Sequence, residues 1–574
     1  MIINDYLCTL FFKVKTMTTK HTPEYIFETS WEVCNMVGGI YTVLSTRART
    51  LCDKYGDKLI FIGPDIWEKS ESPYFEPDNE LLKEWKDHFI NETGLNIRTG
   101  RWKVHGNPVT ILVDFTPIFY KKDSIYSHIW EVYGVDSLHA YGDYDESSMF
   151  GYATGLVMES YYRFHKLTKR NNVVAHFNEW MTTFGAFYIQ ENVPEIATIF
   201  TTHATSIGRS IAGNHKPLYD YLNEYNGDQM AFELNMVSKH STEKKAAHTV
   251  DCFTTVSKIT GLECAQLLDK TPDVITPNGF EDDFVPTGDV FNNKRMAART
   301  RLKQVAEALF GYELQQDTIF ISTAGRYEFK NKGIDVFIES LKRLSFHLQL
   351  TREVVAFIMV PAHIKGPRAD LAAKLANPDA DMDYWNRQTT HDLFDYQYDK
   401  IIESLRWFHF YNLKNEKVKV VFVPSYLSGN DGIFNMAYWD LLIGMDISVF
   451  PSYYEPWGYT PLESVAFSVP TITTDLSGFG QWVKDHYNKK HGAAVVHRSD
   501  YNFSEVTDAI TEILAEFISL NNKKMDEVRN RALETSKKAL WEEFIQYYYE
   551  AYSIALINRD KRLKKTPENT SNTF

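Results

Sequence analysis

The sequence contains little cysteine and no long apolar run. Five of its 574 residues are cysteine, and they are scattered without a C-x-x-C pair or a metal-ligand spacing. This excludes a disulfide scaffold and a zinc module, and it favours a reducing cytoplasm. No stretch approaches the 18 apolar residues that a membrane-spanning helix needs. We therefore expect a cytoplasmic protein with no membrane partner.

Positive charge is also scarce. The chain has 61 Lys+Arg against 75 Asp+Glu, a formal net charge of −14, which argues against binding of nucleic acid by neutralisation of phosphates. The acidic total still permits a small anionic ligand held by a few local cations. With 44% hydrophobic and 24% charged residues, the composition is that of a packed globular protein rather than a disordered or fibrous one.

Several catalytic signatures are missing from the sequence. It has no G-x-G-x-x-G or P-loop motif, which weakens the case for a dinucleotide oxidoreductase or an NTPase. It also has no H-E-x-x-H, G-x-S-x-G or protein-kinase motif set. The pair Gly38-Gly39, between a predicted strand and a predicted helix, is weak evidence by itself, because glycine also serves plain turn geometry.

Short apolar runs alternate with helical patterns along the chain, which is typical of parallel sheets with crossover helices. Helices are expected between the strands, for example over 40–54, 233–248 and 334–348. The predicted strands cover residues 25–29, 59–63, 109–115, 173–176, 196–201, 252–256, 274–276, 319–323, 354–360, 418–423, 447–450 and 471–473.

A break at Pro286-Thr287-Gly288 divides this pattern into two series. We predict an α/β protein of two doubly wound, Rossmann-like domains facing each other across a cleft, because such sheets bind ligands beyond the carboxyl ends of their strands. The predicted parts are an N-terminal extension 1–24 with Met17 as an alternative start, a first domain 25–288, a second domain 289–507 with a helical insertion 366–413, C-terminal helices 508–560 packing back across the domains, and a polar tail 561–574.

The densest candidate site follows the predicted strand at 447–450. Residues 452–463 read S-Y-Y-E-P-W-G-Y-T-P-L-E, and the T-P-x-E ending fits a helix N-cap, a first-turn proline and a capping-box glutamate, Glu463. Backbone N–H groups around Gly458 could hold a phosphate, and Glu455 could face a developing positive charge. The alternative is structural, with Glu463 capping its helix and Glu455 solvated in a loop.

Two further loops follow predicted strands. G-R-Y-E-F-K-N-K-G, at 325–333, could bring Arg326 and Lys332 onto one diphosphate, with Arg as a fork and Lys as a point charge. A polar turn with two solvated cations is the alternative. T-T-H-A-T-S-I-G-R, at 201–209, carries His203 and ends in an arginine, and a structural histidine is equally compatible with that pattern.

Together these strings resemble one family. W-E-V and V-G-G-I-Y-T-V-L between residues 31 and 44, T-T-H-A-T and G-R at 201–209, G-R-Y-E-F and N-K-G at 325–333, and F-P-S-Y-Y-E-P-W-G-Y-T at 450–460 resemble the glycogen synthases of animals and fungi. The ordered blocks run from about residue 25 to residue 482 and so cover most of the chain.

The resemblance implies a GT-B fold and retaining transfer of glucose from UDP-glucose to the non-reducing 4-hydroxyl of an α-1,4-glucan such as glycogen, with no metal or other cofactor. It assigns catalysis to Glu455, His203, Arg326 and Lys332. It assigns donor binding to Arg209, Gly38, Gly39, Tyr426, Tyr438, Gly458, Tyr459, Thr460 and Glu463. In this scheme Tyr438 and Tyr426 hold the base, and Glu463 binds ribose hydroxyls or caps its helix.

Departures from the family pattern bear on regulation. Met36 stands where relatives carry Lys or Arg before V-G-G. The stretch 521–531 has fewer arginines and more acids than the glucose 6-phosphate site of the regulated enzymes, and Asp446 replaces a histidine there. Since acids repel a sugar phosphate, we expect little or no activation by glucose 6-phosphate. The insertion 366–413 is shorter than the one that assembles tetramers, so homo-oligomerisation stays open.

Other functions remain compatible with the sequence. A related GT-B synthase could use ADP-glucose, because stacking on Tyr438 tolerates any base. A catalytically inactive glucan-binding protein belongs to a different class, and the cations Arg326 and Lys332 argue against it because glucan carries no diphosphate. A phosphorylase is disfavoured, since no convincing pyridoxal-lysine context is recognisable.

Overall fold

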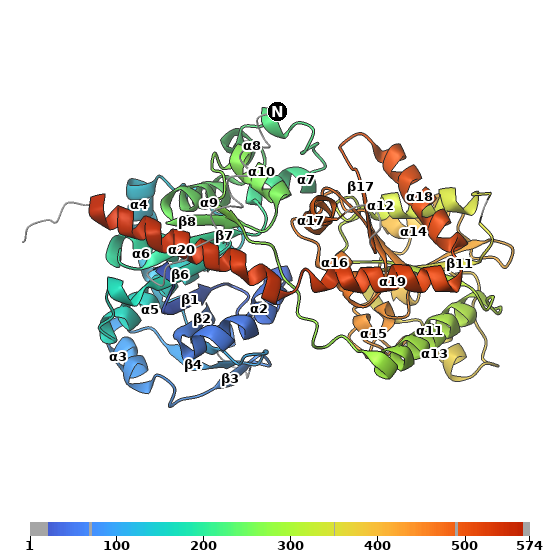
Figure 1. Cartoon of the computed structure of the whole chain (residues 1–574), viewed down its shortest axis with the longest axis horizontal. Coiled ribbons are helices and arrows are strands. Elements are labelled where there is room, and N and C mark those ends of the chain that lie inside the picture. Colours follow the sequence, from blue (N-terminus) through green and yellow to red (C-terminus); the bar gives the residue numbers. More distant parts are fainter. Residues whose placement is uncertain (1–20, 68–71, 349, 488–491, 566–574) are drawn as a thin grey trace, which may run out of the picture. The chain divides into compact units, whose positions relative to one another are not determined.

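The computed structural model describes residues 21–67, 72–348, 350–487 and 492–565. The chain forms two compact units, each with its own sheet (Figure 1). Unit 1 comprises the residues up to Ile211, Tyr221–Gly279 and the residues from Trp541 onward, and unit 2 comprises Ala212–Asp220 and Phe280–Leu540. The alternative start at Met17 lies outside the described residues, and the first strand begins at Tyr25.

Unit 1 is built on a nine-stranded sheet in the order β3-β4-β5-β2-β1-β6-β7-β8-β9. Neighbours are parallel from β5 to β9 in this order, whereas β4 runs antiparallel to both of its neighbours. The strands are β1 (Tyr25–Thr29), β2 (Leu59–Pro64), β3 (Phe75–Pro77), β4 (Ile97–Trp102), β5 (Val109–Val113), β6 (Val173–Asn178), β7 (Ala197–Thr202), β8 (Cys252–Thr255) and β9 (Val274–Ile275).

Helices cover both faces of this sheet, and strand alternation decides which side chain meets which helix. On β1, Phe27 packs edge-on against Tyr161 of α5, while the next residue, Glu28, points to Arg47 of α2 on the opposite face. The helices of this part are α2 (Gly39–Tyr55), α3 (Lys83–Thr93), α4 (Lys122–Tyr133), α5 (Tyr144–Phe164), α6 (Thr183–Asn192), α7 (Ser206–Gly213), α8 (Gly227–Glu233), α9 (Val237–Thr249), α10 (Lys258–Leu267) and α20 (Trp541–Lys565).

Unit 2 is built on a six-stranded parallel sheet in the order β14-β11-β10-β15-β16-β17. Its central strands β10, β11 and β15 are buried along their whole length, which explains why they contain no charged residue. The strands are β10 (Ile319–Ala324), β11 (Val354–Met359), β14 (Val418–Val423), β15 (Ile447–Phe450), β16 (Thr471–Thr474) and β17 (Ala493–Val496), with a separate antiparallel pair, β12 (Ile364–Pro367) and β13 (His391–Leu393).

Apolar side chains pack on both faces of the unit 2 sheet. Ile321 of β10 belongs to the cluster beneath α12, and its neighbour Phe320 belongs to the cluster beneath α11. The helices are α11 (Gly288–Phe310), α12 (Ile334–Ser345), α13 (Ala369–Ala376), α14 (Lys400–Trp407), α15 (Tyr438–Leu442), α16 (Tyr459–Ala466), α17 (Gly478–His486), α18 (Phe503–Ser519) and α19 (Asn522–Lys537).

The prediction that the insertion over 366–413 is helical is wrong for most of the segment. Between β12 and β14 the chain forms two short helices, the strand β13 and long irregular stretches. A buried side chain organises much of it: Arg368 donates to the backbone carbonyls of Asp383 and Thr389, at 3.0 and 3.2 Å. Because this guanidinium, rather than helical hydrogen bonds, satisfies the loop carbonyls, the segment does not require the spacing of apolar residues that is typical of a helix.

Smaller differences concern where elements begin and end. The helix predicted over 233–248 begins later, at Val237, because α8 ends at Glu233 and Asn235 adopts φ 55° in the break before α9. The tail predicted from residue 561 is helical as far as Lys565, the end of α20. The predicted domain boundary at 288 falls inside unit 2 at the start of α11, since the units divide after Gly279.

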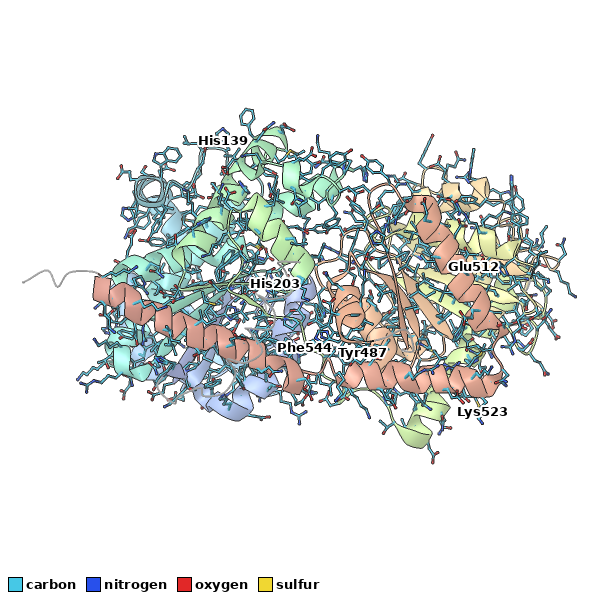
Figure 2. The ribbon with its side chains drawn as sticks, turned by 45° about the horizontal axis from the view of Figure 1, so that its top comes forward. His139, His203, Tyr487, Glu512, Lys523 and Phe544 are labelled. Atoms are coloured by element: carbon cyan, nitrogen blue, oxygen red, sulfur yellow. The ribbon has the colours of Figure 1, made fainter. Side chains whose placement is uncertain are left out.

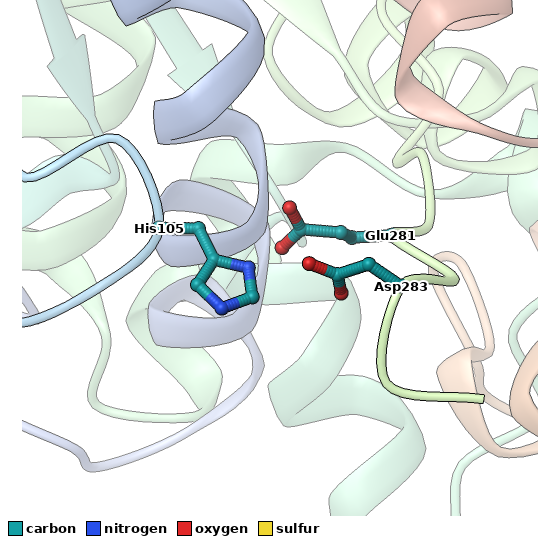
Figure 3. Close-up of side chains that lie close together, drawn as sticks. All are labelled: His105, Glu281 and Asp283. Atoms are coloured by element: carbon teal, nitrogen blue, oxygen red, sulfur yellow. The ribbon is translucent and has the colours of Figure 1, made fainter. Parts of the chain in front are cut away.

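The chain enters unit 2 through a short segment that carries two acids, Glu281 and Asp283 (Figure 3). This segment leads into α11. Across the described ranges, none of the helices is long and apolar enough to span a lipid bilayer.

Candidate active site

In unit 2, the loops after two adjacent strands bring Lys332 and Glu455 together. The loops follow β10 and β15, which pair in parallel, so their carboxyl ends share one edge of the sheet. Lys332 Nζ donates to a Glu455 carboxylate oxygen, and the two side chains are 16% and 15% exposed. The sequence predicted both residues for the site, and the fold joins them across more than a hundred residues of chain.

Backbone hydrogen bonds hold the two loops in register. The Asn331 carbonyl accepts from the N–H groups of Tyr453 and Tyr454, at 2.8 and 3.1 Å. Gly333 lies at φ 67°, and a Cβ there would come 2.0 Å from the Pro451 carbonyl oxygen. Glycine is therefore required for the loops to approach closely enough for the Lys332 side chain to meet its carboxylate.

The T-P-x-E segment does not form the capping box that its sequence predicts. The helix α16 begins at Tyr459, its N-cap is Gly458 at φ 108°, and no side chain caps it. A Cβ on Gly458 would lie 2.8 Å from Ser477 Oγ, which donates to the Trp457 carbonyl at 2.9 Å. Helix initiation by an uncapped glycine leaves the first turn, with Tyr459 and Thr460, as backbone suited to an anion.

Arg326 lies in the same loop as Lys332 but is paired elsewhere. Its guanidinium lies 2.8 Å from Glu328 Oε1, and its side chain is 67% exposed. An exposed ion pair of this kind contributes at most about 1 kcal/mol. Arg326 can therefore exchange Glu328 for an incoming phosphate at low energetic cost.

The predicted base-binding tyrosines lie on adjacent segments with different exposure. The Tyr438 backbone N–H donates to the Leu427 carbonyl at 2.9 Å, which places the start of α15 beside the Tyr426 segment. Tyr426 is 79% exposed, whereas the Tyr438 hydroxyl is buried without a hydrogen-bond partner among the described residues. Burial, and then the charge of Glu463, raise the Tyr438 pKa well above its usual value.

Glu463 is the acid that faces Tyr438, and it lies on α16. Burial raises the pKa of its carboxyl to about 7, although a hydrogen bond from the Trp439 side chain opposes the shift. A carboxyl that is half protonated near neutrality can accept or donate a hydrogen bond. This property fits recognition of hydroxyl groups better than a role as a helix cap, which the start of α16 at Tyr459 also excludes.

In unit 1, His203 follows β7 and is almost fully buried (Figure 2). Its ring Nε2 lies 3.0 Å from Asn178 Oδ1, and its backbone N–H donates to Glu179 Oε1 at 2.8 Å. Burial, followed by the charge of Arg47, lowers the His203 pKa to about 3, so the imidazole is neutral. The histidine predicted from the T-T-H-A-T string is thus held in one orientation.

Sequence reasoning missed Glu179, whose side chain accepts the hydrogen bond from the His203 backbone N–H. Its backbone has φ 66° and ψ 160°, a region that is essentially restricted to glycine and that costs about 1–3 kcal/mol. Burial, and then the charge of Glu243, raise the Glu179 pKa to about 8. Its sequence signal is an acid three residues after the predicted strand at 173–176, at the carboxyl edge where ligands bind.

Arg209 lies on α7, and its side chain is exposed. Its charge acts on the buried acids Glu179 and Glu243, lowering the pKa of each. Glu243 in turn accepts from Ser206, through the backbone N–H at 2.8 Å and the hydroxyl at 2.6 Å. The first turn of α7 is therefore anchored on a carboxylate, which holds the arginine at the helix surface.

Some of the backbone N–H groups around the glycine pair at the start of α2 are already hydrogen-bonded within the protein. Glu32 Oε2 accepts from the backbone N–H groups of Gly38 and Tyr41, at 2.7 and 2.8 Å. This carboxylate, which sequence reasoning also missed, neutralises the helix N-terminus. A Cβ on Gly39 would meet nothing within 4 Å, so the space beside Gly39, rather than the N–H of Gly38, is what a ligand could use.

A second charged cluster surrounds Asp446, the residue expected to repel a sugar phosphate. Three arginines, Arg295, Arg299 and Arg529, lie 2.9, 2.8 and 2.6 Å from its carboxylate. The Phe320 backbone N–H also donates to it, at 2.9 Å. Asp446 is therefore the counter-ion of an arginine cluster, which corrects the expectation that it acts by simple repulsion.

Comparisons with known proteins agree with this architecture. The catalytic domain of starch synthase IV from Arabidopsis thaliana superposes with a TM-score of 0.55 at 13% identity, covering 93% of this chain and 100% of that chain. Liver glycogen [starch] synthase of Mus musculus is 30% identical, over 92% of this chain and 83% of its own length. Glycogen [starch] synthase of Neurospora crassa is 29% identical, with the same coverage.

The fold is that of the GT-B class, as the resemblance implied. Within that class the chain belongs to the glycogen synthase family, whose model matches residues 28–370 and 383–572. The two matched stretches contain every residue predicted for the site, from Gly38 to Glu463.

Proposed function

We propose that this protein transfers glucose, with retention of configuration, from UDP-glucose to the non-reducing 4-hydroxyl end of an α-1,4-glucan such as glycogen. The observation that carries the proposal is the Lys332–Glu455 ion pair at the carboxyl edge of the unit 2 sheet. It pairs a cation suited to a leaving diphosphate with a carboxylate suited to a cationic sugar, in a chain of the glycogen synthase family.

The chemistry of the transfer explains why both charges are needed. Cleavage of the bond between glucose C1 and the diphosphate oxygen leaves positive charge on the sugar and negative charge on UDP. Lys332, Arg326 and the first turn of α16 suit the second charge, and Glu455 orients the sugar and stabilises the first. The acceptor hydroxyl attacks C1 from the face that UDP leaves, and its proton passes to a phosphate oxygen, so the configuration is kept.

The remaining assignments follow the family resemblance. We assign His203 to the transferred glucose and Arg209 to the diphosphate, with Gly38 and Gly39 beside the donor. Tyr426 and Tyr438 are assigned to the uracil, Glu463 to the ribose, and the backbone of Gly458, Tyr459 and Thr460 to the distal phosphate. The exposed face of Tyr426 and the uncapped start of α16 support these roles. We also propose a cytoplasmic location, in keeping with four unpaired cysteines among the described residues.

Glu455→Gln tests the proposal because it removes the charge and keeps the shape. We expect glucose transfer to glycogen to fall by roughly 10²–10³-fold, the usual effect of losing one electrostatic contact to a transition state. UDP affinity, measured by calorimetry, should change little. Glu512→Gln on α18, whose side chain is 73% exposed, is the matched control and should leave transfer unchanged. Near-normal turnover of Glu455→Gln would contradict the assignment.

A further inference from the structure

Asn178 is the last residue of β6 and lies buried against His203. Its side-chain nitrogen donates to Glu28 Oε1 at 2.7 Å and to the Thr29 carbonyl at 3.1 Å. An ionised carboxylate and a backbone carbonyl can only accept, so these two bonds establish which end of the amide is nitrogen. The other end, Oδ1, is therefore the atom 3.0 Å from His203 Nε2.

The ionisation of Glu28 is secured by its neighbours. Burial opposes the charge, but Arg47 lies 2.7 Å from Oε1 and His176 lies 3.3 Å from Oε2, and together they hold the Glu28 pKa at about 2. Arg47 is itself 1% exposed and lies over the Tyr548 ring of α20, 4.2 Å from its centroid. The acceptor facing Asn178 thus stays an acceptor throughout the pH range of ordinary assays.

The tautomer of His203 follows from this arrangement. The ring is neutral and carries one proton. Because Asn178 Oδ1 can only accept, that proton lies on Nε2, and Nδ1 is left as a lone pair. The backbone bond from His203 N–H to Glu179 fixes the loop, and the ring cannot turn over without breaking its contact with Asn178.

We infer that Asn178 is a positioning residue that makes His203 a hydrogen-bond acceptor, through Nδ1, for one hydroxyl of the transferred glucose. The inference rests on the proposed function, which places the donor glucose against His203. It determines what the site can recognise. The hydroxyl in question must donate its proton, and a substituent that can only accept does not replace it.

Fluorinated donors test this direction of hydrogen bonding. In each UDP-glucose analogue one glucose hydroxyl is replaced by fluorine, which cannot donate. For each analogue the loss of kcat/KM relative to UDP-glucose is compared between the wild type and Asn178→Leu, so the inductive effect of fluorine at that position, which is the same in both proteins, cancels. Leucine offers no acceptor to Nε2, so the ring proton is no longer confined to Nε2 and Nδ1 can donate. For one analogue the loss should then be at least tenfold smaller than in the wild type, while the losses for the other analogues stay unchanged.

A matched control separates positioning from stability. Thr201→Val removes the buried 2.6 Å hydrogen bond to His176 Nε2 in the same cluster and leaves the Asn178–His203 contact in place. It should lower the melting temperature without changing the analogue ratios. Unchanged ratios in Asn178→Leu would overturn the inference. Absence of transfer from UDP-glucose by the wild-type protein would instead overturn the proposed function.

A second pair of variants keeps the inference testable if Asn178→Leu does not fold. In His203→Asn the amide oxygen can occupy the position of Nδ1, whereas in His203→Gln the amide reaches the position of Nε2. We expect His203→Asn to retain the discrimination against the fluorinated donor and His203→Gln to lose it. The reverse order, or equal ratios in the two variants, would overturn the inference.

Discussion

Glu179 combines a backbone conformation normally left to glycine with a carboxyl that resists ionisation. Both features are unfavourable for folding. Both persist because the Glu179 carboxyl accepts the hydrogen bond from the His203 backbone N–H and so holds the His203 loop. Strain of this kind collects where a fold must hold a reacting group in one place. At the scale of the residue, unit 1 therefore uses folding free energy to orient its histidine.

The raised pKa of Glu179 predicts how stability depends on pH. Between about pH 4.5, its ordinary pKa, and about pH 8, its folded value, the unfolded chain releases a proton that the folded chain keeps. Stability contributed by this site therefore falls as pH rises through that window, by at most about 1.4 kcal/mol per unit. Glu179→Gln, which cannot ionise, should melt above the wild type at pH 8 and approach it at pH 5.

Melting curves of both proteins from pH 5 to pH 9 check this prediction. Glu512→Gln serves as the control for removing a carboxylate from an exposed position. A constant difference between Glu179→Gln and the wild type across the range would contradict the assigned pKa.

At the scale of the element, Asp446 links α11 and α19 to Phe320, near the start of β10. Burial opposes its charge, but Arg299, Arg295 and Arg529 lower its pKa below the usual value. The stability that it contributes is therefore present above about pH 4, its ordinary range, and is lost as pH falls through the lower folded pKa. Three elements depend on one carboxylate.

Asp446→Asn should destabilise the protein by roughly 3 kcal/mol, because it leaves three partly buried arginines without their buried counter-ion. Asp440→Asn is the matched control, since Asp440 pairs with the exposed Lys294 and should cost at most about 1 kcal/mol. Thermal denaturation measures both.

The wild-type protein should show no several-fold rise in transfer rate with glucose 6-phosphate, and such a rise would contradict the view that Asp446 occupies these arginines.

Strands made largely of apolar residues could be predicted from the sequence, and strands rich in polar residues and glycine could not. β10, β11, β14 and β15 are largely apolar, and each lies within one residue of its predicted position. β4 was missed because it reads I-R-T-G-R-W: its arginines bond Asp65 and Asp57, and Gly100 packs against the β3 backbone. The residues of β4 are determined by contacts with residues distant in sequence, and no local sequence pattern reveals such contacts.

The same distinction applies to the candidate site. The loop motifs predicted Lys332, Glu455 and His203, and the fold brings the first two into contact. No role was predicted for Glu179, Glu32 or Asn178, because an acid or amide at the end of a strand marks the ligand-binding edge of a sheet but does not reveal which group it contacts. Helix capping by Thr460 and Glu463 failed because Gly458, one residue before the helix, already starts it.

At the scale of the whole molecule, the order of the chain differs from its division into units. The C-terminal helix α20 follows unit 2 in sequence but belongs to unit 1, where Trp541, Tyr548 and Tyr552 are buried. The net charge of −14 likewise conceals local excesses of positive charge such as the arginines around Asp446. Function in this protein depends on a few charges that the overall composition does not reveal.

The most direct test of the account is glucose incorporation into glycogen from radiolabelled UDP-glucose and ADP-glucose, measured side by side with the full-length protein. We predict that UDP-glucose is the preferred donor and that β-amylase, which cleaves α-1,4 linkages from non-reducing ends, releases the incorporated label. Preference for ADP-glucose would contradict the donor assignment. Absence of incorporation from either donor, with glycogen binding intact, would contradict the central claim that this protein is a glucan synthase.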